Sequence, residues 1–337
     1  MKRSIHDSRF TTRALRTLRL VPFAFCLAVT PAAAQGWSPS KNIDIIVSSG
    51  AGGAADREAR ETQHFLQQLP GMPPVTVINR QGGGGTVAWS SVAQREGDGH
   101  TISTLNVALL TNQILGSAKI GYRDLTPLTI MMREFIAVWT RTESPITSAS
   151  DLVARLKKDP SSVSFGLSPA LGNQNHIVLG MIAKAAGIDP KALKIVVYSS
   201  GGQGMTAALG GHVDVWAGTL GGALARARKG GGIRVLGVSA EQRPAGPAAE
   251  LPTFREQGMD VVYAAFRGWQ GPPGLTDAQR AFWDQAFSTI VNSDEWKKVE
   301  LRNAWGSGYL DSAATRKFLD GEYEMLRKTL AELGVIK

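Results

Sequence analysis

Short runs rich in β-branched residues alternate with amphipathic stretches along this chain, and this alternation constrains its fold more than any other feature. The apolar run 43–47 is followed by a Gly/Ser-rich segment and a predicted helix over 56–69. A second strand over 75–78, four consecutive glycines at 82–85 and a third strand over 100–105 continue the pattern. Strand, loop, helix and strand in this order are typical of βαβ units, whose strands pair in parallel. The sequence therefore predicts an α/β fold.

The alternation continues through the middle of the chain, and the last part is mostly helical. From Thr276 onward, apolar residues recur at helical spacing. The length of the chain suits two domains rather than one. Further strands are predicted over 135–140, 163–166, 195–198, 213–217 and 233–238, and further helices over 87–94, 150–158, 174–186 and 203–209.

The first 34 residues have the three parts of a secretory signal peptide. A basic lead that begins with Lys2 and Arg3 is followed by an apolar stretch from Leu20 to Val29 and by small residues up to Ala34. A membrane-spanning helix needs about 20 apolar residues, which this stretch does not reach. We therefore predict cleavage after Ala34 and a periplasmic location, reached by the general secretion route because no paired arginines precede the apolar stretch. A basic tail on a cytosolic protein is the alternative.

Removing residues 1–34 changes what the composition implies. The net charge falls from +9 to +4, since 31 basic and 27 acidic residues remain. No run of lysines and arginines survives, so a nucleic-acid partner is not indicated. Cys26, the single cysteine, leaves with the leader, so the mature chain has no disulfide and no thiol chemistry. The remaining chain has no second apolar segment of membrane-spanning length, which predicts a soluble protein.

The loop after the first predicted strand is the sharpest local signal. Residues 50–55 fit the G-x-G-x-x-A turn of dinucleotide-binding proteins. Asn79-Arg80 replaces the acidic residue expected after the second strand, and an arginine there would suit the 2′-phosphate of NADP. An NADP-dependent oxidoreductase is therefore an alternative, although the periplasm is not supplied with free NADP(H). Both interpretations share a helix N-terminus that attracts an anion, whether phosphate or carboxylate.

Side chains that would support catalysis or metal binding are not grouped in the sequence. The histidines that remain after cleavage, at 64, 100, 176 and 212, show no close metal-ligand spacing. A G-x-S-x-G elbow is absent, and no Ser/His/Asp set can be assembled. We therefore predict that the protein is not an enzyme and has no catalytic residue, no metal and no cofactor.

Several segments are distinctive when they are taken in their order and spacing. They are 45–57, Asn79-Arg80 with the four glycines, 97–101, 211–214, 232–239, 251–258, 266–269 with 272–274, and 293–296. Together they resemble the periplasmic receptors of the tripartite tricarboxylate transporter family, and the resemblance covers essentially all of the mature chain. It implies a receptor that captures a small organic carboxylate, with a di- or tricarboxylate favoured, and delivers it as a monomer to membrane permease subunits. A ligand-sensing receptor without transport is a second alternative.

The resemblance also implies a fold and its division. The fold is that of a type II periplasmic binding protein, a Venus flytrap with two Rossmann-like lobes joined by hinge strands near residues 140 and 263. Residues 35–139 plus 264–337 would form lobe 1, residues 140–263 would form lobe 2, and residues 1–34 would be the cleaved signal peptide.

The ligand-binding residues are likewise implied by the resemblance. Main-chain N–H groups and hydroxyls of the first loop would hold a carboxylate, with Asp56 organising the start of the helix. Two loops of lobe 2 would complete the site. The predicted set is Ser48, Ser49, Ala51, Gly52, Gly53, Asp56, Asn106, Ser168, Asn173, His176, Ser199, Ser200, Gly201, Asp214 and Arg267.

Two of these residues have an alternative, structural role, and three positions of the chain depart from the family pattern. Asp214 could contact a polar group of the ligand or cap a turn. Arg267 could clamp a second carboxylate or form a structural ion pair. Ser48-Ser49 replaces the proline–aromatic pair common in the family, which makes the loop more polar and implies a different ligand. His100 stands where the family usually has tyrosine.

Overall fold

One long and almost entirely buried strand, β4 (Thr126–Arg141), organises the fold because it belongs to two sheets. Up to Phe135 it pairs with β9 (Ala264–Gly271), and from Ile136 onward it pairs with β7 (Val215–Thr219) and β8 (Ile233–Val238). The computed structural model describes residues 36–336. The predicted signal peptide therefore lies outside the described residues.

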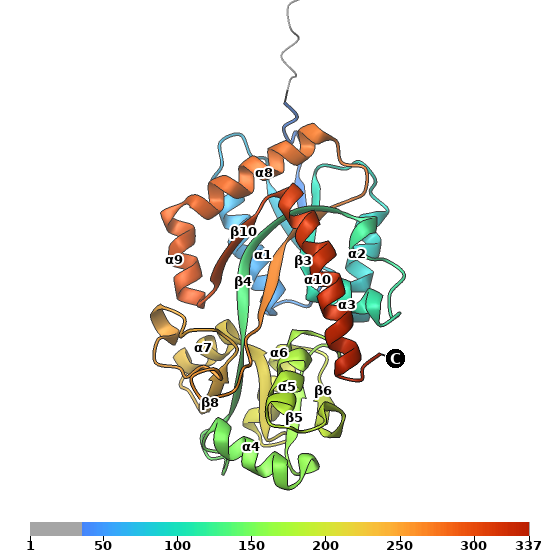
Figure 1. Cartoon of the computed structure of the whole chain (residues 1–337). Coiled ribbons are helices and arrows are strands. Elements are labelled where there is room, and N and C mark those ends of the chain that lie inside the picture. The colour runs from blue at the N-terminus through green and yellow to red at the C-terminus, as the bar shows by residue number, and fades with distance from the viewer. Residues whose placement is uncertain (1–35, 337) are drawn as a thin grey trace, which may run out of the picture. The chain divides into compact units, whose positions relative to one another are not determined.

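The first sheet combines three parallel strands with antiparallel ones. Its order is β2, β1, β3, β9 and β4, and β10 pairs with β4 as well. Helices cover both faces (Figure 1). Its buried core includes Ile45, Trp283 and Trp296. The elements not yet given are β1 (Ile43–Val47), β2 (Val75–Asn79), β3 (Thr101–Asn106), β10 (Gly306–Leu310), α1 (Ala54–Leu66), α2 (Thr86–Ala93), α3 (Val107–Ile114), α8 (Asp277–Asn292), α9 (Asp294–Asn303) and α10 (Ser312–Glu332).

The second sheet holds three parallel strands beside the end of β4. Its order is β6, β5, β7 and β4, with β8 also on β4. Phe165 and Val215 lie in its buried core. Its remaining elements are β5 (Ser164–Leu167), β6 (Lys194–Val197), α4 (Ala149–Lys158), α5 (Gln174–Ala185), α6 (Gly201–Leu209) and α7 (Leu220–Arg228).

The strand directions bring two sets of loops toward each other. Because β9 is antiparallel to both β3 and β4, β4 leaves the first sheet in the direction in which β3 points. In the second sheet β7 is antiparallel to β4, and β5 and β6 run with β7, so these three strands point back toward the first sheet. The carboxyl ends of β1 and β3 therefore face those of β5, β6 and β7 (Figure 1). Ligands of α/β proteins bind at such carboxyl ends.

The end of α10 contacts helix α5 of the second sheet. The Nζ atom of Lys184 lies 2.6 Å from Oε2 of Glu332. A Cβ atom on Gly180 would lie 2.2 Å from Leu333, so the absence of a side chain there allows the close approach. Helix α10 therefore forms a third connection between the elements of the two sheets, in addition to those made by β4 and β9.

All of the predicted elements are present, and five observed strands and helices, one of them in part, were not predicted. All eight predicted strands and the five predicted helices between them lie within a few residues of observed elements, and the helical end is found as α8, α9 and α10. The prediction missed the first half of β4 as well as β9, β10, α3 and α7.

Candidate functional site

Two helices of the first sheet begin at a glycine and have no capping side chain. Gly53 precedes α1 and Gly85 precedes α2, and neither offers a side-chain acceptor. Each of the eight other α-helices among residues 36–336 begins at an Asn, Ser, Thr or Asp whose side chain accepts a first-turn N–H. The first N–H groups of a helix have no partner within the helix itself. At α1, the N–H groups of Ala54 and Ala55 have no acceptor in the described part of the chain, so this helix start attracts an anion.

Asp56 fixes the loop that precedes α1. Its carboxylate is 2% exposed and accepts hydrogen bonds from Gly52 N (2.9 Å), Asn79 Nδ2 (3.0 Å) and Arg60 Nε (3.1 Å). Asn79 Nδ2 also donates to the carbonyl of Ser49 at 3.0 Å. Burial alone would raise the pKa of Asp56, but the hydrogen bonds from Arg60, Gly52 and Asn79 outweigh it and lower that pKa. The ionised carboxylate holds the loop in place and uses the Gly52 N–H, which is then not available to a ligand.

Ser48 follows β1, and its hydroxyl oxygen accepts hydrogen bonds from two side chains of β3. Its Oγ accepts from Thr104 Oγ1 at 2.9 Å and from Asn106 Nδ2 at 3.4 Å. The Oδ1 atom of Asn106 is engaged as the cap of α3. Because a hydroxyl has one hydrogen and two lone pairs, Ser48 still has a proton to donate. Ser48, Asn106 and the start of α1 thus share one edge of the first sheet.

The serines predicted for the second sheet lie at the facing edge. Ser168 follows β5 and Ser199 follows β6, and the register pairs the ends of these two strands. The Oγ of Ser168 lies 3.7 Å from the position of a Cβ on Gly201. Ser200 caps α6 through Gln203 N at 3.2 Å, and the Ser199 hydroxyl donates to Gln203 Oε1 at 2.7 Å. The structure therefore brings these four predicted residues together.

Asn173 and His176 are placed behind Ser168. The side chain of Asn173 is 2% exposed, caps α5 through the N–H groups of Asn175 and His176, and donates to the carbonyl of Ser168. The Nδ1 atom of His176 accepts from Gly172 N at 3.0 Å, and burial lowers the pKa of this histidine. Both side chains shape the loop from inside, and their hydrogen bonds are internal.

Asp214 lies away from both edges, whereas Arg267 is paired with Asn106 in the register of β9 and β3, at the loop edge of the first sheet. Both side chains have structural partners. Asp214 precedes β7, at the end of the strand away from the loops, and accepts from Ser164 N at 2.8 Å and Oγ at 2.6 Å. Arg267 is 4% exposed, pairs with Glu134 and lies 3.7 Å from Glu58 Oε2. Burial would lower the pKa of Arg267, but these two carboxylates raise it. The place of Asp214 in its strand does not favour a ligand contact, and a ligand contact by Arg267 stays a prediction.

Two residues at these edges are not among the predicted site residues. Arg57, in the first turn of α1, donates from NH1 to the carbonyl of Gly52 at 2.9 Å. Thr219 ends β7 and caps α7 through Gly222 N at 3.2 Å. A threonine between an apolar run and a helical stretch is a recognisable N-cap signal, whereas nothing local distinguishes Arg57.

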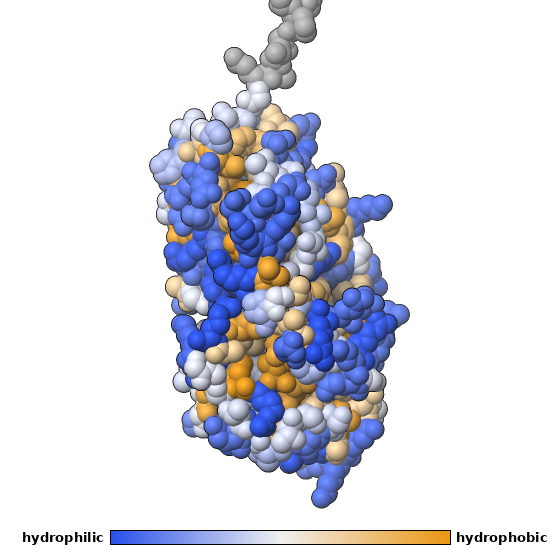
Figure 2. Space-filling view, turned by 90° about the vertical axis from the view of Figure 1, so that its left-hand side faces the viewer, coloured by the Kyte–Doolittle hydropathy of each residue, from blue (hydrophilic) through white to orange (hydrophobic). Residues whose placement is uncertain are grey.

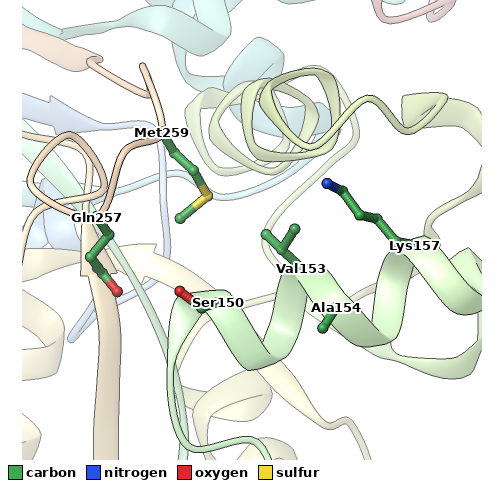
Figure 3. Close-up of a pocket in the computed structure, with 6 residues that line it drawn as sticks. All are labelled: Ser150, Val153, Ala154, Lys157, Gln257 and Met259. Carbon is green, nitrogen blue, oxygen red and sulfur yellow. The ribbon is translucent and has the colours of Figure 1, made fainter.

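A separate depression of about 280 Å³ lies along α4, away from both loop edges (Figure 3). In Figure 3, Met259 and Gln257 face the α4 side chains across it. None of the predicted site residues lines it. Its lining residues are Ser150, Val153, Ala154, Lys157, Gln257 and Met259.

Two further properties hold for residues 36–336. In this part of the chain, no three His, Cys, Asp or Glu side chains are grouped as a metal site would require. Nor does any helix in it combine the length and the apolar character needed to cross a bilayer.

Comparisons with known proteins agree on one family. The model of the tripartite tricarboxylate transporter family receptor matches residues 59–334. A UPF0065 protein of Bordetella bronchiseptica is 33% identical over 247 residues, which are 72% of this chain and 70% of the relative.

Two solved structures have a similar fold. Rpa4515 of R. palustris, solved with adipate, superposes with a TM-score of 0.80 at 22% identity and covers 88% of this chain and 98% of its own. MatC from Rhodopseudomonas palustris, solved with bound malate, superposes with a TM-score of 0.76 at 19% identity and covers 87% of this chain and 100% of its own. The predicted α/β fold of the periplasmic-binding-protein type is confirmed.

Proposed function

The chain belongs to the tripartite tricarboxylate transporter receptor family, and from this premise we propose that it is a solute receptor for a small organic carboxylate. It captures the ligand in the periplasm and releases it unchanged to membrane permease subunits. The general secretion route delivers it there, and it acts as a monomer without a cofactor. A dicarboxylate or tricarboxylate is favoured.

The observation that carries this proposal is the uncapped start of α1. Its N–H groups at Ala54 and Ala55 have no acceptor among the described residues, while Asp56 holds the preceding loop in a fixed conformation. A rigid set of main-chain donors at the positive end of a helix suits a carboxylate and contributes no acid or base. The Ser48 hydroxyl adds a donor beside it.

The second set of loops supplies the other half of the site. Residues 35–139 with 264–337 form one lobe and 140–263 the other, joined by β4 and β9. Ser168, Ser199, Ser200 and Gly201 then approach the ligand from the second lobe. Two proteins of similar fold, solved with adipate and with malate, support a dicarboxylate as the class of ligand. A ligand held between both sets of loops favours closure of the lobes.

Thermal unfolding of the protein without residues 1–34, in the presence of a carboxylate library, tests the proposal. A dicarboxylate or tricarboxylate is expected to raise the unfolding temperature, and NMR of the recovered compound is expected to show it unchanged. Chemical conversion of the ligand, or no stabilisation by any carboxylate, would refute the receptor. NADPH fluorescence measured in the same samples tests the oxidoreductase alternative, which predicts saturable binding of NADPH.

A further inference from the structure

A second depression, of about 340 Å³, lies directly beside the predicted carboxylate loop. One wall is the outer face of α1, which contributes Arg57, Arg60 and Glu61. The other wall is the end of α9, which contributes Asn303, and the turn before β10, which contributes Trp305. Figure 2 shows the side of the molecule on which α7 and α9 lie, where hydrophilic and hydrophobic areas alternate. The depression adjoins the loop through Arg57, whose guanidinium reaches the carbonyl of Gly52.

Two of the three charged residues in this depression are neutralised by partners. Arg60 pairs with Asp56, with 3.1 Å between NH2 and Oδ1. Glu61 pairs with Arg302 of α9. Within residues 36–336, Arg57 has no carboxylate oxygen within 4.0 Å, and the Gly52 carbonyl is its one hydrogen-bond acceptor. Arg57 therefore leaves a net positive charge in the depression.

The guanidinium of Arg57 is partly withdrawn from water. Burial lowers the pKa of Arg57, an effect that Glu134 and Asp56 partly offset and Arg267 adds to. A guanidinium carries five N–H donors, of which one hydrogen bond to a carbonyl uses only a part. A shielded cation without a directly paired carboxylate is costly, and an anion placed against it relieves that cost.

The position of Arg57 relates it to the carboxylate site. Arg57 follows Ala54 and Ala55 by two to three residues, which is about 3 to 4.5 Å along a helix axis. Its NH1 atom returns to the loop at Gly52, so the open N–H groups and the guanidinium flank the same loop. The second sheet borders this region too, because a Cβ on Gly221 of α7 would lie 3.3 Å from the carbonyl oxygen of Asn303.

We propose that Arg57 is a specificity-determining residue that binds the second carboxylate of a dicarboxylate whose first carboxylate lies at the start of α1. The planar guanidinium forms paired hydrogen bonds with that carboxylate. Trp305 covers the carbon chain between the two charges. A monocarboxylate lacks the group that reaches Arg57 and is bound more weakly. This inference rests on the proposed receptor function.

The test is isothermal titration of the wild-type protein and variants with adipate and hexanoate, which share a chain length and differ by one carboxylate, and with malate. The wild type is expected to prefer adipate or malate to hexanoate. Arg57→Gln is expected to weaken dicarboxylate binding about 10- to 100-fold, as the loss of a charge-assisted hydrogen bond would, and to leave hexanoate binding within about twofold. Arg316→Gln, which removes the same charge from an exposed position on α10, is the matched control and is expected to change neither.

Arg57→Lys is measured alongside because it keeps the charge but loses the planar fork. It is expected to fold as the wild type does and to retain a dicarboxylate preference at about tenfold weaker affinity. Unchanged dicarboxylate affinity in either folded variant, or an equal loss for adipate and hexanoate, would overturn the inference and leave the receptor function standing. If no carboxylate binds the wild type, the proposed function itself fails.

Discussion

Replacing Glu58 by glutamine is expected to stabilise the protein at alkaline pH and to have little effect at pH 5. Glu58 lies in the first turns of α1 and is 1% exposed. Its Oε1 atom has no hydrogen-bond partner among the described residues, and its Oε2 atom lies 3.7 Å from Arg267. Burial raises the pKa of Glu58 to about 8. The repulsion from Glu134 raises this pKa further, and the attraction of Arg267, which lowers it, is too weak to offset the two.

The magnitude follows from that pKa. The unfolded chain loses the Glu58 proton near pH 4.5, whereas the folded protein keeps it up to about pH 8. Between these values the free energy of unfolding falls by about 1.4 kcal/mol per pH unit as pH rises. The stability that protonated Glu58 contributes is fully present below pH 4.5, and it is lost as the pH rises through the folded-state pKa. Glutamine resembles the protonated acid and does not titrate, so the free energy of unfolding of the variant should exceed that of the wild type by about 5 kcal/mol at pH 9.

Urea unfolding of both proteins at each pH unit from 5 to 9 measures this difference. The two curves of unfolding free energy against pH are expected to converge near pH 5 and to separate steadily above it. Glu295→Gln, which removes an exposed carboxylate from α9, serves as the control for the loss of one negative charge. Parallel curves for the wild type and Glu58→Gln would show that Glu58 is ionised in the folded protein and would refute the raised pKa of this carboxyl group.

Three other substitutions separate the site from the scaffold. Asp56→Asn removes a buried carboxylate that accepts from three donors. It should lower the free energy of unfolding by about 2–3 kcal/mol and weaken carboxylate binding in titration. Unchanged affinity would contradict the role of Asp56 in the loop. Asp214→Asn weakens the hydrogen bonds from Ser164. It should lower the free energy of unfolding in urea by about 1 kcal/mol and leave the dissociation constant of the carboxylate within about twofold. A larger change in affinity would place Asp214 at the ligand. Gly268→Ala puts a Cβ 1.9 Å from the Thr129 carbonyl oxygen and should destabilise by more than about 2 kcal/mol in thermal unfolding; a wild-type melting temperature would refute that close approach.

The sequence predicted most of the elements that are locally apolar, although it missed α3, and it missed strands that bury polar residues. The runs at 43–47 and 233–238 are observed with those bounds. The first half of β4 was missed because Arg133 and Glu134 interrupt its apolar run, and Glu134 is buried only because Arg267 of β9 pairs with it. In β9, Gly268 argues against a strand, yet only glycine fits against the neighbouring backbone there. Both strands are therefore stabilised by contacts between residues more than 100 positions apart in the sequence, which a local pattern does not reveal.

The same distinction applies to the candidate site. The loop before α1 could be predicted because its glycines and Asp56 are consecutive in sequence. The role of Arg57 could not, because its surroundings depend on Trp305, which is brought beside it by α9 and β10. Asp214 stands at the amino end of β7, whereas ligands of α/β proteins bind at the carboxyl ends of strands. The predicted strand over 213–217 therefore already argued against a ligand contact by Asp214.

Main-chain N–H groups at the start of α1 are proposed to bind a carboxylate. Amide NMR of the ¹⁵N-labelled protein, titrated with adipate and with malate, observes these groups themselves. We expect the amide protons of Ala54 and Ala55 to shift downfield and to saturate with the dissociation constant found by calorimetry. Saturable binding that leaves both of these amides unmoved, or shifts confined to the depression along α4, would contradict the claim.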